Sequence, residues 1–175
     1  MSFRVRKASL RDIEGFFELF KKSLQTQFPQ YTNNTIRYFL DVDYRLSWLK
    51  EAITEKKRLV LIAETSKGEI IGYLFSGKPY GGVGFCNWVA VDDKYKKQGV
   101  GTALLNKWED VMKKQGAHIV QLLTVERNIA FYKSRGYKLV GEIPDNYFGT
   151  NDHLFYKLLQ KPKETNFLRG YLKKR

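Results

Sequence analysis

Residues 95–102 read Tyr95-Lys96-Lys97-Gln98-Gly99-Val100-Gly101-Thr102. An apolar, β-rich run at 85–91 precedes this stretch, and a helix-like apolar run that begins at Ala103 follows it. The order predicts a strand, a glycine turn and the start of a helix. Glycine lets a ligand approach the backbone, and the first turn of a helix has N–H groups outside the helical ladder, so such a turn suits a pyrophosphate. A G-x-G turn is equally typical of a plain structural connection, so the interpretation needs support from elsewhere in the chain.

Two common phosphate loops do not fit this turn. A Walker A loop ends in Gly-Lys-Ser/Thr, whereas Gly101 is followed by Thr102 and Ala103. A dinucleotide-binding turn needs a third glycine three residues after the second, and that position is Leu104. Both interpretations are therefore excluded.

The turn resembles the coenzyme A pyrophosphate loop of the GCN5-related N-acetyltransferases (GNAT), whose signature is Arg or Gln, two residues, Gly, one residue, then Gly or Ala. Lys96 takes the first position and departs from the usual Arg or Gln, because it donates to phosphate without a bidentate fork. The resemblance implies acetyl-CoA as cosubstrate and a strand that lies beside its pantetheine arm. The implied coenzyme-binding residues are Val89, Ala90, Val91, Lys96, Lys97, Gln98, Gly99, Val100, Gly101 and Thr102.

A second segment resembles the same family. The family has an Asn after the next strand, then Ala, Phe-Tyr and a Gly-aromatic pair; this chain has Val125-Glu126-Arg127-Asn128-Ile129-Ala130-Phe131-Tyr132-Lys133-Ser134-Arg135-Gly136-Tyr137. The spacing from Asn128 to Tyr132 is shorter than the commonest form. The resemblance, which covers residues 3–160, implies that Asn128 and Tyr132 contact coenzyme A and that Tyr132 protonates the leaving thiolate.

Direct transfer also requires a neutral amine. A lysine-like amine has a pKa of about 10.4, so at pH 7 a base or a water chain must remove its proton. Many family members carry a Glu on the fourth strand, but that strand reads Phe85-Cys86-Asn87-Trp88 here. We therefore favour water-mediated deprotonation through backbone carbonyls and Asn87, with Glu126 as the nearest acid. An N–H near Val89 is the expected donor to the oxyanion. Cys86 is expected to be a buried thiol.

The acceptor amine is left open between two alternatives. Aromatic residues of the segment after the first helix, Phe28 and Tyr31 among them, are suited to wall a pocket for a small cationic amine. The connection 141–152 carries Tyr147 and resembles the Tyr-bearing loop of peptide N-terminal acetyltransferases. That second resemblance implies a peptide acceptor.

Composition is compatible with an enzyme of this class. The chain has 175 residues, 43% of them hydrophobic, which predicts one domain, 1–160, followed by a basic tail, 161–175. The start has no signal-peptide pattern and no apolar run is long enough to span a membrane, so we expect a cytoplasmic protein without a membrane partner. One cysteine, Cys86, and two separate histidines, His118 and His153, predict no metal site.

The formal net charge is +13, and the segment from Lys161 to Arg175 contributes six basic residues against one acidic residue. A solvated terminus explains this tail better than a nucleic-acid arm does. A tail that packs as a helix through Phe167, Leu168, Tyr171 and Leu172 is a third interpretation.

Periodicity predicts the elements coarsely. Strands are expected at 3–7, 59–64, 70–76, 85–91, 118–124, 137–140 and 153–159, and helices from 9 to before Pro29, at 36–53, at 99–115 and ending at Gly136. We expect an α/β (α+β) fold: a mixed, mostly antiparallel central sheet flanked by helices, which is the GNAT fold. The function it implies is acetyl transfer to a primary amine in a ternary complex. A non-catalytic module that binds coenzyme A or nucleic acid is the alternative, and monomer and homodimer both stay open.

Overall fold

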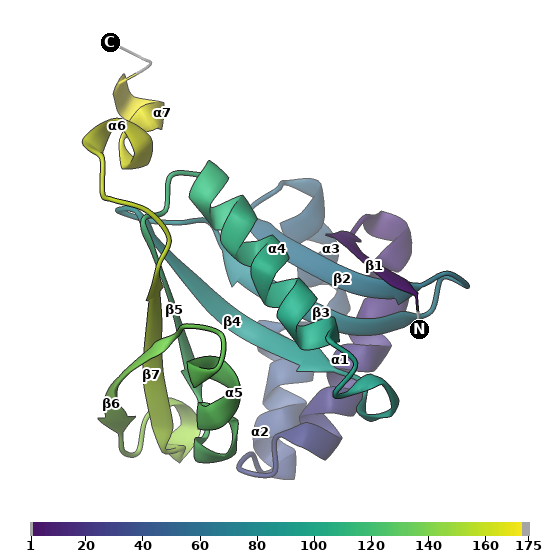
Figure 1. Ribbon diagram of the computed structural model, residues 1–175. Coiled ribbons are helices and arrows are strands. Elements are labelled where there is room, and N and C mark those ends of the chain that lie inside the picture. The colour runs from purple at the N-terminus through teal and green to yellow at the C-terminus, as the bar shows by residue number, and fades with distance from the viewer. Residues whose placement is uncertain (1, 173–175) are drawn as a thin grey trace. The chain divides into compact units, whose positions relative to one another are not determined.

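The computed structural model describes residues 2–172 (Figure 1). Its strands are β1 (Phe3–Lys7), β2 (Arg58–Thr65), β3 (Ile70–Gly77), β4 (Val83–Val91), β5 (Ile119–Thr124), β6 (Lys138–Ile143) and β7 (Asp152–Leu158). They form one sheet in the order β1-β2-β3-β4-β5-β7-β6. The β4–β5 pair is parallel, whereas the β1–β2, β5–β7 and β6–β7 pairs are antiparallel. The mixed, mostly antiparallel sheet flanked by helices is thus confirmed.

Seven α-helices lie within the described residues: α1 (Ile13–Gln27), α2 (Asn33–Tyr38), α3 (Leu46–Thr54), α4 (Val100–Lys114), α5 (Ile129–Lys133), α6 (Glu164–Phe167) and α7 (Arg169–Leu172). The described residues also include short helical turns: the 3-10 helices η1 (Leu10–Asp12), η3 (Asp93–Tyr95), η4 (Glu126–Asn128) and η5 (Tyr147–Gly149), and the π-helix η2 (Phe39–Asp43). No helix among residues 2–172 is long and apolar enough to cross a membrane.

The chain divides into two compact units. One comprises the residues up to Phe75 together with Trp88–Leu105, and the other comprises Ser76–Asn87 together with the chain from Asn106 onward. We call them the N-terminal unit and the C-terminal unit.

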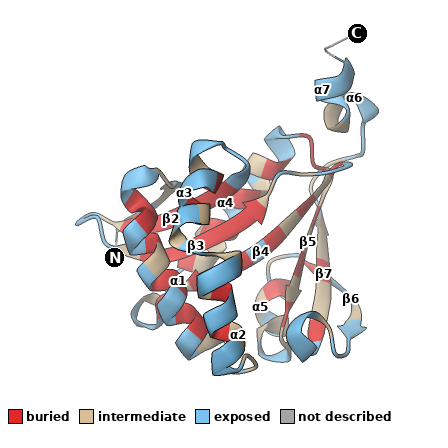
Figure 2. Ribbon diagram, turned by 180° about the vertical axis from the view of Figure 1, so that it is seen from behind, coloured by how far each residue is buried: buried red, intermediate tan, exposed pale blue. Residues whose placement is uncertain are grey.

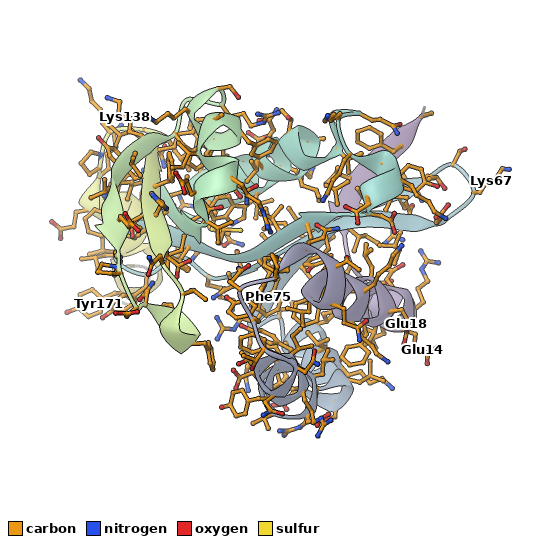
Figure 3. The ribbon with its side chains drawn as sticks, turned by 90° about the horizontal axis from the view of Figure 1, so that it is seen from below. Glu14, Glu18, Lys67, Phe75, Lys138 and Tyr171 are labelled. Carbon is orange, nitrogen blue, oxygen red and sulfur yellow. The ribbon has the colours of Figure 1, made fainter. Side chains whose placement is uncertain are left out.

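The core of the N-terminal unit is aromatic. Strands β2 and β3 are buried along almost their whole length, as the red segments of Figure 2 show. Helix α1 packs its apolar face, including Phe16 and Phe20, into this core. The opposite face carries Glu14 and Glu18, which point outward (Figure 3). The predicted helical periodicity of this segment is therefore confirmed.

The helical stretch expected at 36–53 is interrupted. It is divided into α2, the π-helix η2 and α3. In η2 the N–H of Tyr44 donates to the carbonyl of Phe39 at 2.7 Å, which is the i→i+5 pattern of a π turn. The wide turn brings Tyr44 and Phe39 into ring contact at 6.1 Å in the aromatic core. Both rings also contact Trp88, at 5.5 and 5.8 Å, so the π turn places them in the core in a way that the regular helical period did not predict.

A second difference from expectation lies before β4, which begins at Val83 rather than at residue 85. Tyr80 and Val83 exchange both backbone hydrogen bonds, and the two residues between them, Gly81 and Gly82, have φ of 56° and 81°. Two central residues with positive φ form the tight hairpin turn that matches strand twist. Gly81 and Gly82 therefore form a two-residue turn that leads into β4.

In the C-terminal unit, β5 pairs with β7 along its full length, and its inward residues alternate as Val120, Leu122 and Thr124. Strand β6 lies at the edge, is mostly exposed (Figure 2), and has a bulge between Leu139 and Gly141. Helix α5 lies beside this sheet in Figure 1.

The start of the basic tail packs on the C-terminal unit. Nitrogen Nε2 of Gln160 donates to the carbonyl of Ala117 at 2.8 Å, and the Phe167 ring lies 6.0 Å from the His118 ring. A Cβ at Gly116 would collide with the backbone of Asn166, so that glycine admits α6. Leu168, Tyr171 and Leu172 are exposed. The segment up to Phe167 is thus not a frayed end, although the residues after it expose their apolar side chains.

This contact gives a prediction on stability. Phe167→Ala removes a half-buried ring and should lower the free energy of unfolding by about 1 kcal/mol, or Tm by about 2–4 °C. Tyr171→Ala is the matched control, because Tyr171 is 54% exposed and should change Tm little. Calorimetry of the two variants measures the difference, and equal Tm values would show that the tail does not pack.

Candidate active site

The connection from β4 to α4 is held in place by Asp92. Its N–H donates to the carbonyl of Ile71 at 2.9 Å, its Oδ1 accepts from the Lys94 N–H at 3.0 Å, and its Oδ2 accepts from Lys22 Nζ at 2.6 Å. Burial raises the pKa of Asp92, but the hydrogen bonds from Lys22 and Lys94 outweigh it and leave the pKa below its usual value. Asp92 therefore sets the turn into the connection, and Lys22 of α1 contributes a second contact that holds it.

The backbone of the turn at Gly99 leaves room for a ligand. Gly99 has φ of 84°, and a Cβ built on it would meet nothing within 4 Å. The carbonyl of Gly99 accepts from the Ala103 N–H at 3.0 Å, which starts α4. Gly101 is the second residue of that helix. The chain therefore leaves open space over the helix start, where an anion fits the positive end of the helix dipole.

Side chains of the turn also brace it. Gln98 Nε2 donates to the carbonyl of Lys94 at 3.1 Å, and Lys96 pairs with Asp93 at 2.5 Å on the surface. Lys97 has φ of 59°, an unusual conformation for a lysine. Val100 is 1% exposed and lies over Gly72 of β3, where a Cβ would stand 3.1 Å from Val100 Cγ1. The helix start thus sits directly on the strand.

The predicted strand residues beside the turn are on β4. Ala90 is buried, whereas Val89 and Val91 are half-buried on the other face, to which the exposed Asn87 also belongs. The β4–β5 ladder ends at the pair Cys86 and Leu122. The carbonyl of Val91 accepts from Gln27 Nε2 at 2.9 Å. The residues of β4 from Asn87 onward therefore lie beyond its pairing with β5.

The ion pair between Lys22 and Asp92 leads to a prediction for coenzyme A affinity. Lys22→Met removes the brace on Asp92 and should weaken coenzyme A binding by about three- to tenfold, because a less ordered turn must be fixed on binding. Lys21→Met is the control. Lys21 is an exposed lysine next to Lys22 in the sequence, and the ion pair with Asp92 is made by Lys22. Isothermal titration calorimetry measures both, and equal affinities would show that Lys22 has no role in the turn.

In the C-terminal unit, Tyr132 is a buried phenol on α5. It is 5% exposed, and its ring contacts Phe131, Tyr137 and Phe155 at centroid distances of 5.1, 5.7 and 5.8 Å. Burial and the nearby Cys86 raise the pKa of Tyr132, while a hydrogen bond with Thr124 lowers it; burial dominates. The phenol is therefore protonated at neutral pH.

Thr124 and Asn128 complete this group. Thr124 is buried at the end of β5, and Asn128 Nδ2 donates to its Oγ1 at 3.0 Å. Asn128, expected at the coenzyme, is thus also linked to Tyr132 through one hydroxyl. Glu126 is exposed in η4, and Cys86 is buried, as expected.

The buried tyrosines predict an alkaline limit of stability. Burial raises the pKa of Tyr137 too, and Glu109, which accepts its hydroxyl at 2.8 Å, adds to the shift. Both phenols keep their protons in the folded state above pH 10, where the unfolded chain loses them, so stability is complete below about pH 10 and falls as the pH rises further. Urea unfolding at pH 9 and pH 11 measures the fall. Tyr137→Phe should reduce it, and an unchanged fall would remove Tyr137 as a cause.

The residues expected to bind the acceptor amine lie in both units. Phe28 and Tyr31 are half-buried in the N-terminal unit, where both rings contact Trp88, at 5.2 and 6.1 Å. Tyr147 is 65% exposed on the β6–β7 loop of the C-terminal unit. That loop is tied down by the buried Asp152, whose Oδ2 accepts from Asn146 and Thr150 at 3.0 and 3.2 Å.

Residues 14–137 match the model of the acetyltransferase (GNAT) family, and they include both motifs. The chain belongs to the GNAT family. This GNAT chain is 34% identical over 89 residues to the uncharacterized protein YdhI of Bacillus subtilis, a match that covers 47% of this chain and 52% of that protein. The chain spans about half the length of the curated relatives that it matches.

Solved structures share the GNAT fold. The PaiA N-acetyltransferase of Thermoplasma acidophilum, solved with coenzyme A, has a TM-score of 0.74 at 23% identity, with 90% of this chain and 99% of that chain covered. A phosphinothricin acetyltransferase of Sinorhizobium meliloti, solved with acetyl-CoA, also has a TM-score of 0.74 at 17% identity, with 95% and 96% covered. At these identities the likeness concerns the fold.

Three residues of the site were not anticipated from the sequence. Lys22 and Gln27 reach the turn region from α1, and no local pattern marks a contact so distant along the chain. Thr124 had a detectable signal, because a polar residue takes the third inward position of β5 after Val120 and Leu122. No group of three or more His, Cys, Asp or Glu side chains within residues 2–172 is placed to hold a metal ion.

Proposed function

We propose that this protein is an N-acetyltransferase that moves the acetyl group of acetyl-CoA to a primary amine by direct attack in a ternary complex. The observation that carries the proposal is the turn at Gly99, whose positive φ and open space precede a helix start in a chain of the GNAT family. The acetyl-CoA and coenzyme A in the solved relatives support the same cosubstrate.

Binding of the coenzyme pyrophosphate is assigned to the N-terminal unit. Backbone N–H groups of the turn and the helix start, from Gln98 to Thr102, donate to the pyrophosphate, and Lys96 and Lys97 add positive charge. The weak surface pair of Lys96 with Asp93 costs little to exchange for a phosphate. Residues Val89, Ala90 and Val91 lie along the pantetheine arm, and a backbone N–H near Val89 donates to the developing oxyanion.

The reaction follows from the groups assigned to it. The amine nitrogen forms a bond to the acetyl carbon, the C–S bond breaks with its electron pair on sulfur, and the Tyr132 hydroxyl gives its proton to that sulfur. The phenolate then recovers a proton from water. Because burial disfavours the phenolate, Tyr132 stays protonated until the thiolate forms beside it.

The amine proton leaves through water held by backbone carbonyls and Asn87, whose side chain is exposed on β4. Glu126 is the alternative base. A direct base at Glu126 predicts an acid limb in the pH profile that Glu126→Gln removes, whereas the water route leaves that profile nearly unchanged.

For the acceptor, a peptide amino group is supported by the β6–β7 loop. Asp152 fixes this loop, and Tyr147 is presented to solvent beside Phe148, which has φ of 57°. A small amine next to Phe28 and Tyr31 is the alternative. We place the protein in the cytoplasm, as a monomer or homodimer.

Incubation with acetyl-CoA and a panel of polyamines, amino acids and peptides, followed by mass spectrometry, tests the proposal. The expected result is a mass increase of one acetyl group on a primary amine. Coenzyme A binding without transfer to any acceptor would favour a non-catalytic module, a possibility motivated by the missing carboxylate on β4.

A further inference from the structure

The turn before β4 and the C-terminal segment adjoin one another in the C-terminal unit. The N–H of His118 donates to the carbonyl of Gly82 at 2.8 Å. A Cβ built on Gly82 would stand 2.3 Å from His118 Nδ1 and 3.3 Å from Phe167 Cδ1, so only a glycine lets both rings come this close to the turn. The turn that carries Tyr80 and the helix α6 therefore lie together at one end of this unit.

Apolar side chains at this end are exposed to solvent. Tyr80 is 92% exposed, although its N–H and carbonyl both pair with Val83, at 3.0 and 2.9 Å. The ring therefore stands on a fixed turn. Leu168, Tyr171 and Leu172 are also exposed, and α7 is pale blue in Figure 2. Single exposed apolar residues are ordinary, but several on adjoining segments mark a contact surface.

Exposed basic side chains accompany this apolar group. The end of α4 adjoins the same segment, because Gln160 Nε2 donates to the carbonyl of Ala117 at 2.8 Å. Glu164 and Asp110 are the acidic residues on these segments. No carboxylate within residues 2–172 forms an ion pair with the basic residues of this end, whereas Lys157 of β7 pairs with Glu109. These basic residues are Lys78, Lys113, Lys114, Lys161, Lys163 and Arg169.

The types of exposed residue select the partner. Six cations against two carboxylates favour an anionic partner. A single-stranded nucleic acid would stack its bases on the tyrosine rings but would gain little from leucine side chains. The interface of a lipid bilayer suits all three types: leucine enters the acyl boundary, tyrosine lies at headgroup level, and lysine reaches anionic headgroups. An anionic lipid surface therefore fits the whole group of residues.

We propose that this end of the C-terminal unit binds the surface of membranes that contain anionic lipids. The lipid-binding end comprises the Tyr80 turn, the end of α4 and residues 161–172. Tyr80, Leu168 and Leu172 enter the interface, and the basic side chains contact the headgroups. The expectation of no membrane partner concerns spanning segments, whereas surface binding needs none. The inference does not depend on acetyl transfer.

Binding should depend on lipid charge and on salt. We expect the full chain to sediment with vesicles of phosphatidylcholine and phosphatidylserine at a ratio of about 7:3, and not with vesicles of phosphatidylcholine alone. Raising the salt from about 0.1 M to about 1 M shortens the Debye length from about 10 Å to about 3 Å and should release most of the protein.

A pair of lysines at the end of α4 tests the location of the charge. Each basic residue near an anionic surface strengthens binding about fivefold, so Lys113→Gln with Lys114→Gln should weaken it about 10- to 25-fold. Lys107→Gln with Lys133→Gln is the matched control, because it removes the same charge from the same unit. Lys107 is about 10 Å from Lys114 along α4, and Lys133 ends α5, so the control should stay within about threefold. Thermal unfolding checks that each variant is folded.

The apolar contribution has its own readout. Cys86 is the single cysteine of the chain and is buried, so Tyr80→Cys provides a selective site for the environment-sensitive fluorophore nitrobenzoxadiazole. Its emission should move to shorter wavelength when the anionic vesicles are added, whereas the same label on Ser134→Cys of the α5 end should not respond. Leu168→Ser with Leu172→Ser should weaken binding at least about tenfold at unchanged net charge.

Several outcomes would overturn the proposal. These are sedimentation that is absent or equal with the two kinds of vesicle, an unshifted label at Tyr80→Cys, and equal losses in the two pairs of lysine variants. Fluorescein-labelled single-stranded RNA is the competing probe. If the chain binds this RNA but no vesicles, and Lys113→Gln with Lys114→Gln weakens RNA binding, nucleic acid is the partner and the lipid proposal is wrong. Acetyl transfer is measured without vesicles, so the two proposals fail separately.

Discussion

Tyr132→Phe is expected to lower kcat for acetyl transfer by about 10²- to 10⁴-fold, while coenzyme A affinity stays nearly unchanged. The substitution keeps the ring, so the packing against Phe131, Tyr137 and Phe155 is retained. It removes the proton that we assign to the leaving sulfur. Steady-state kinetics with a saturating acceptor measures kcat, and calorimetry measures coenzyme A binding.

Tyr137→Phe is the matched control. Tyr137 is 2% exposed and belongs to the same unit, and its hydroxyl donates to Glu109 rather than toward a reacting group. The control should retain kcat within about threefold even if it is less stable, because a buried hydrogen bond to a carboxylate contributes about 1.5–3 kcal/mol. Equal losses in the two variants would indicate a packing effect. Near-normal turnover of Tyr132→Phe, with chemistry shown to be rate-limiting, would make water the proton donor.

A valine at Gly99 or Gly101 is expected to weaken coenzyme A binding on the order of 100-fold, which is about 2.7 kcal/mol. At Gly99 the side chain would occupy the open space where nothing lies within 4 Å, and valine would also resist the φ of 84°. At Gly101, inside the first turn of α4, the effect is steric contact with the bound phosphate. Calorimetry with coenzyme A measures both variants.

Gly68 supplies a closely matched control for Gly99. It has φ of 83°, and a Cβ there also meets nothing within 4 Å, but it lies in the β2–β3 turn. Gly68→Val should therefore show the same backbone strain as Gly99→Val, with coenzyme A affinity unchanged. If folded Gly99→Val and Gly101→Val proteins bind coenzyme A as the unmodified chain does, the turn is not the pyrophosphate site.

Features of the fold encoded by short-range patterns were predictable from the sequence. The apolar strand before the glycine turn, the turn at Gly99 and the apolar helical spacing of α1 are each set by a few neighbouring residues, and all three form, although β4 begins two residues earlier than expected. The π turn from Phe39 to Tyr44 was missed, because ring packing in the core decides it. The docking of Phe167 was not the preferred interpretation, since a basic composition is typical of a solvated end and the contact depends on the distant His118.

In the candidate site too, contacts between residues far apart in the chain were not predictable from the sequence. Tyr132 was identified through its motif, but its raised pKa depends on burial among side chains that the motif does not specify. The brace from Lys22 to Asp92 joins residues far apart in the chain, so only the folded structure reveals it. Thr124 has a polar side chain at an inward strand position, and its contact with Asn128 depends on the turn after β5, which the strand pattern does not specify.

The contact beneath the helix start has a consequence for sequence variation. A methyl group on Gly72 would stand 3.1 Å from Val100 Cγ1, 3.2 Å from Leu104 Cδ1 and 3.2 Å from the carbonyl oxygen of Ala90. The side-chain volume that fits at residue 72 therefore depends on the side chains at residues 100 and 104. We expect natural variants with alanine at 72 to carry smaller side chains at 100 or 104, so a glycine of β3 should coevolve with the turn that we propose binds the coenzyme.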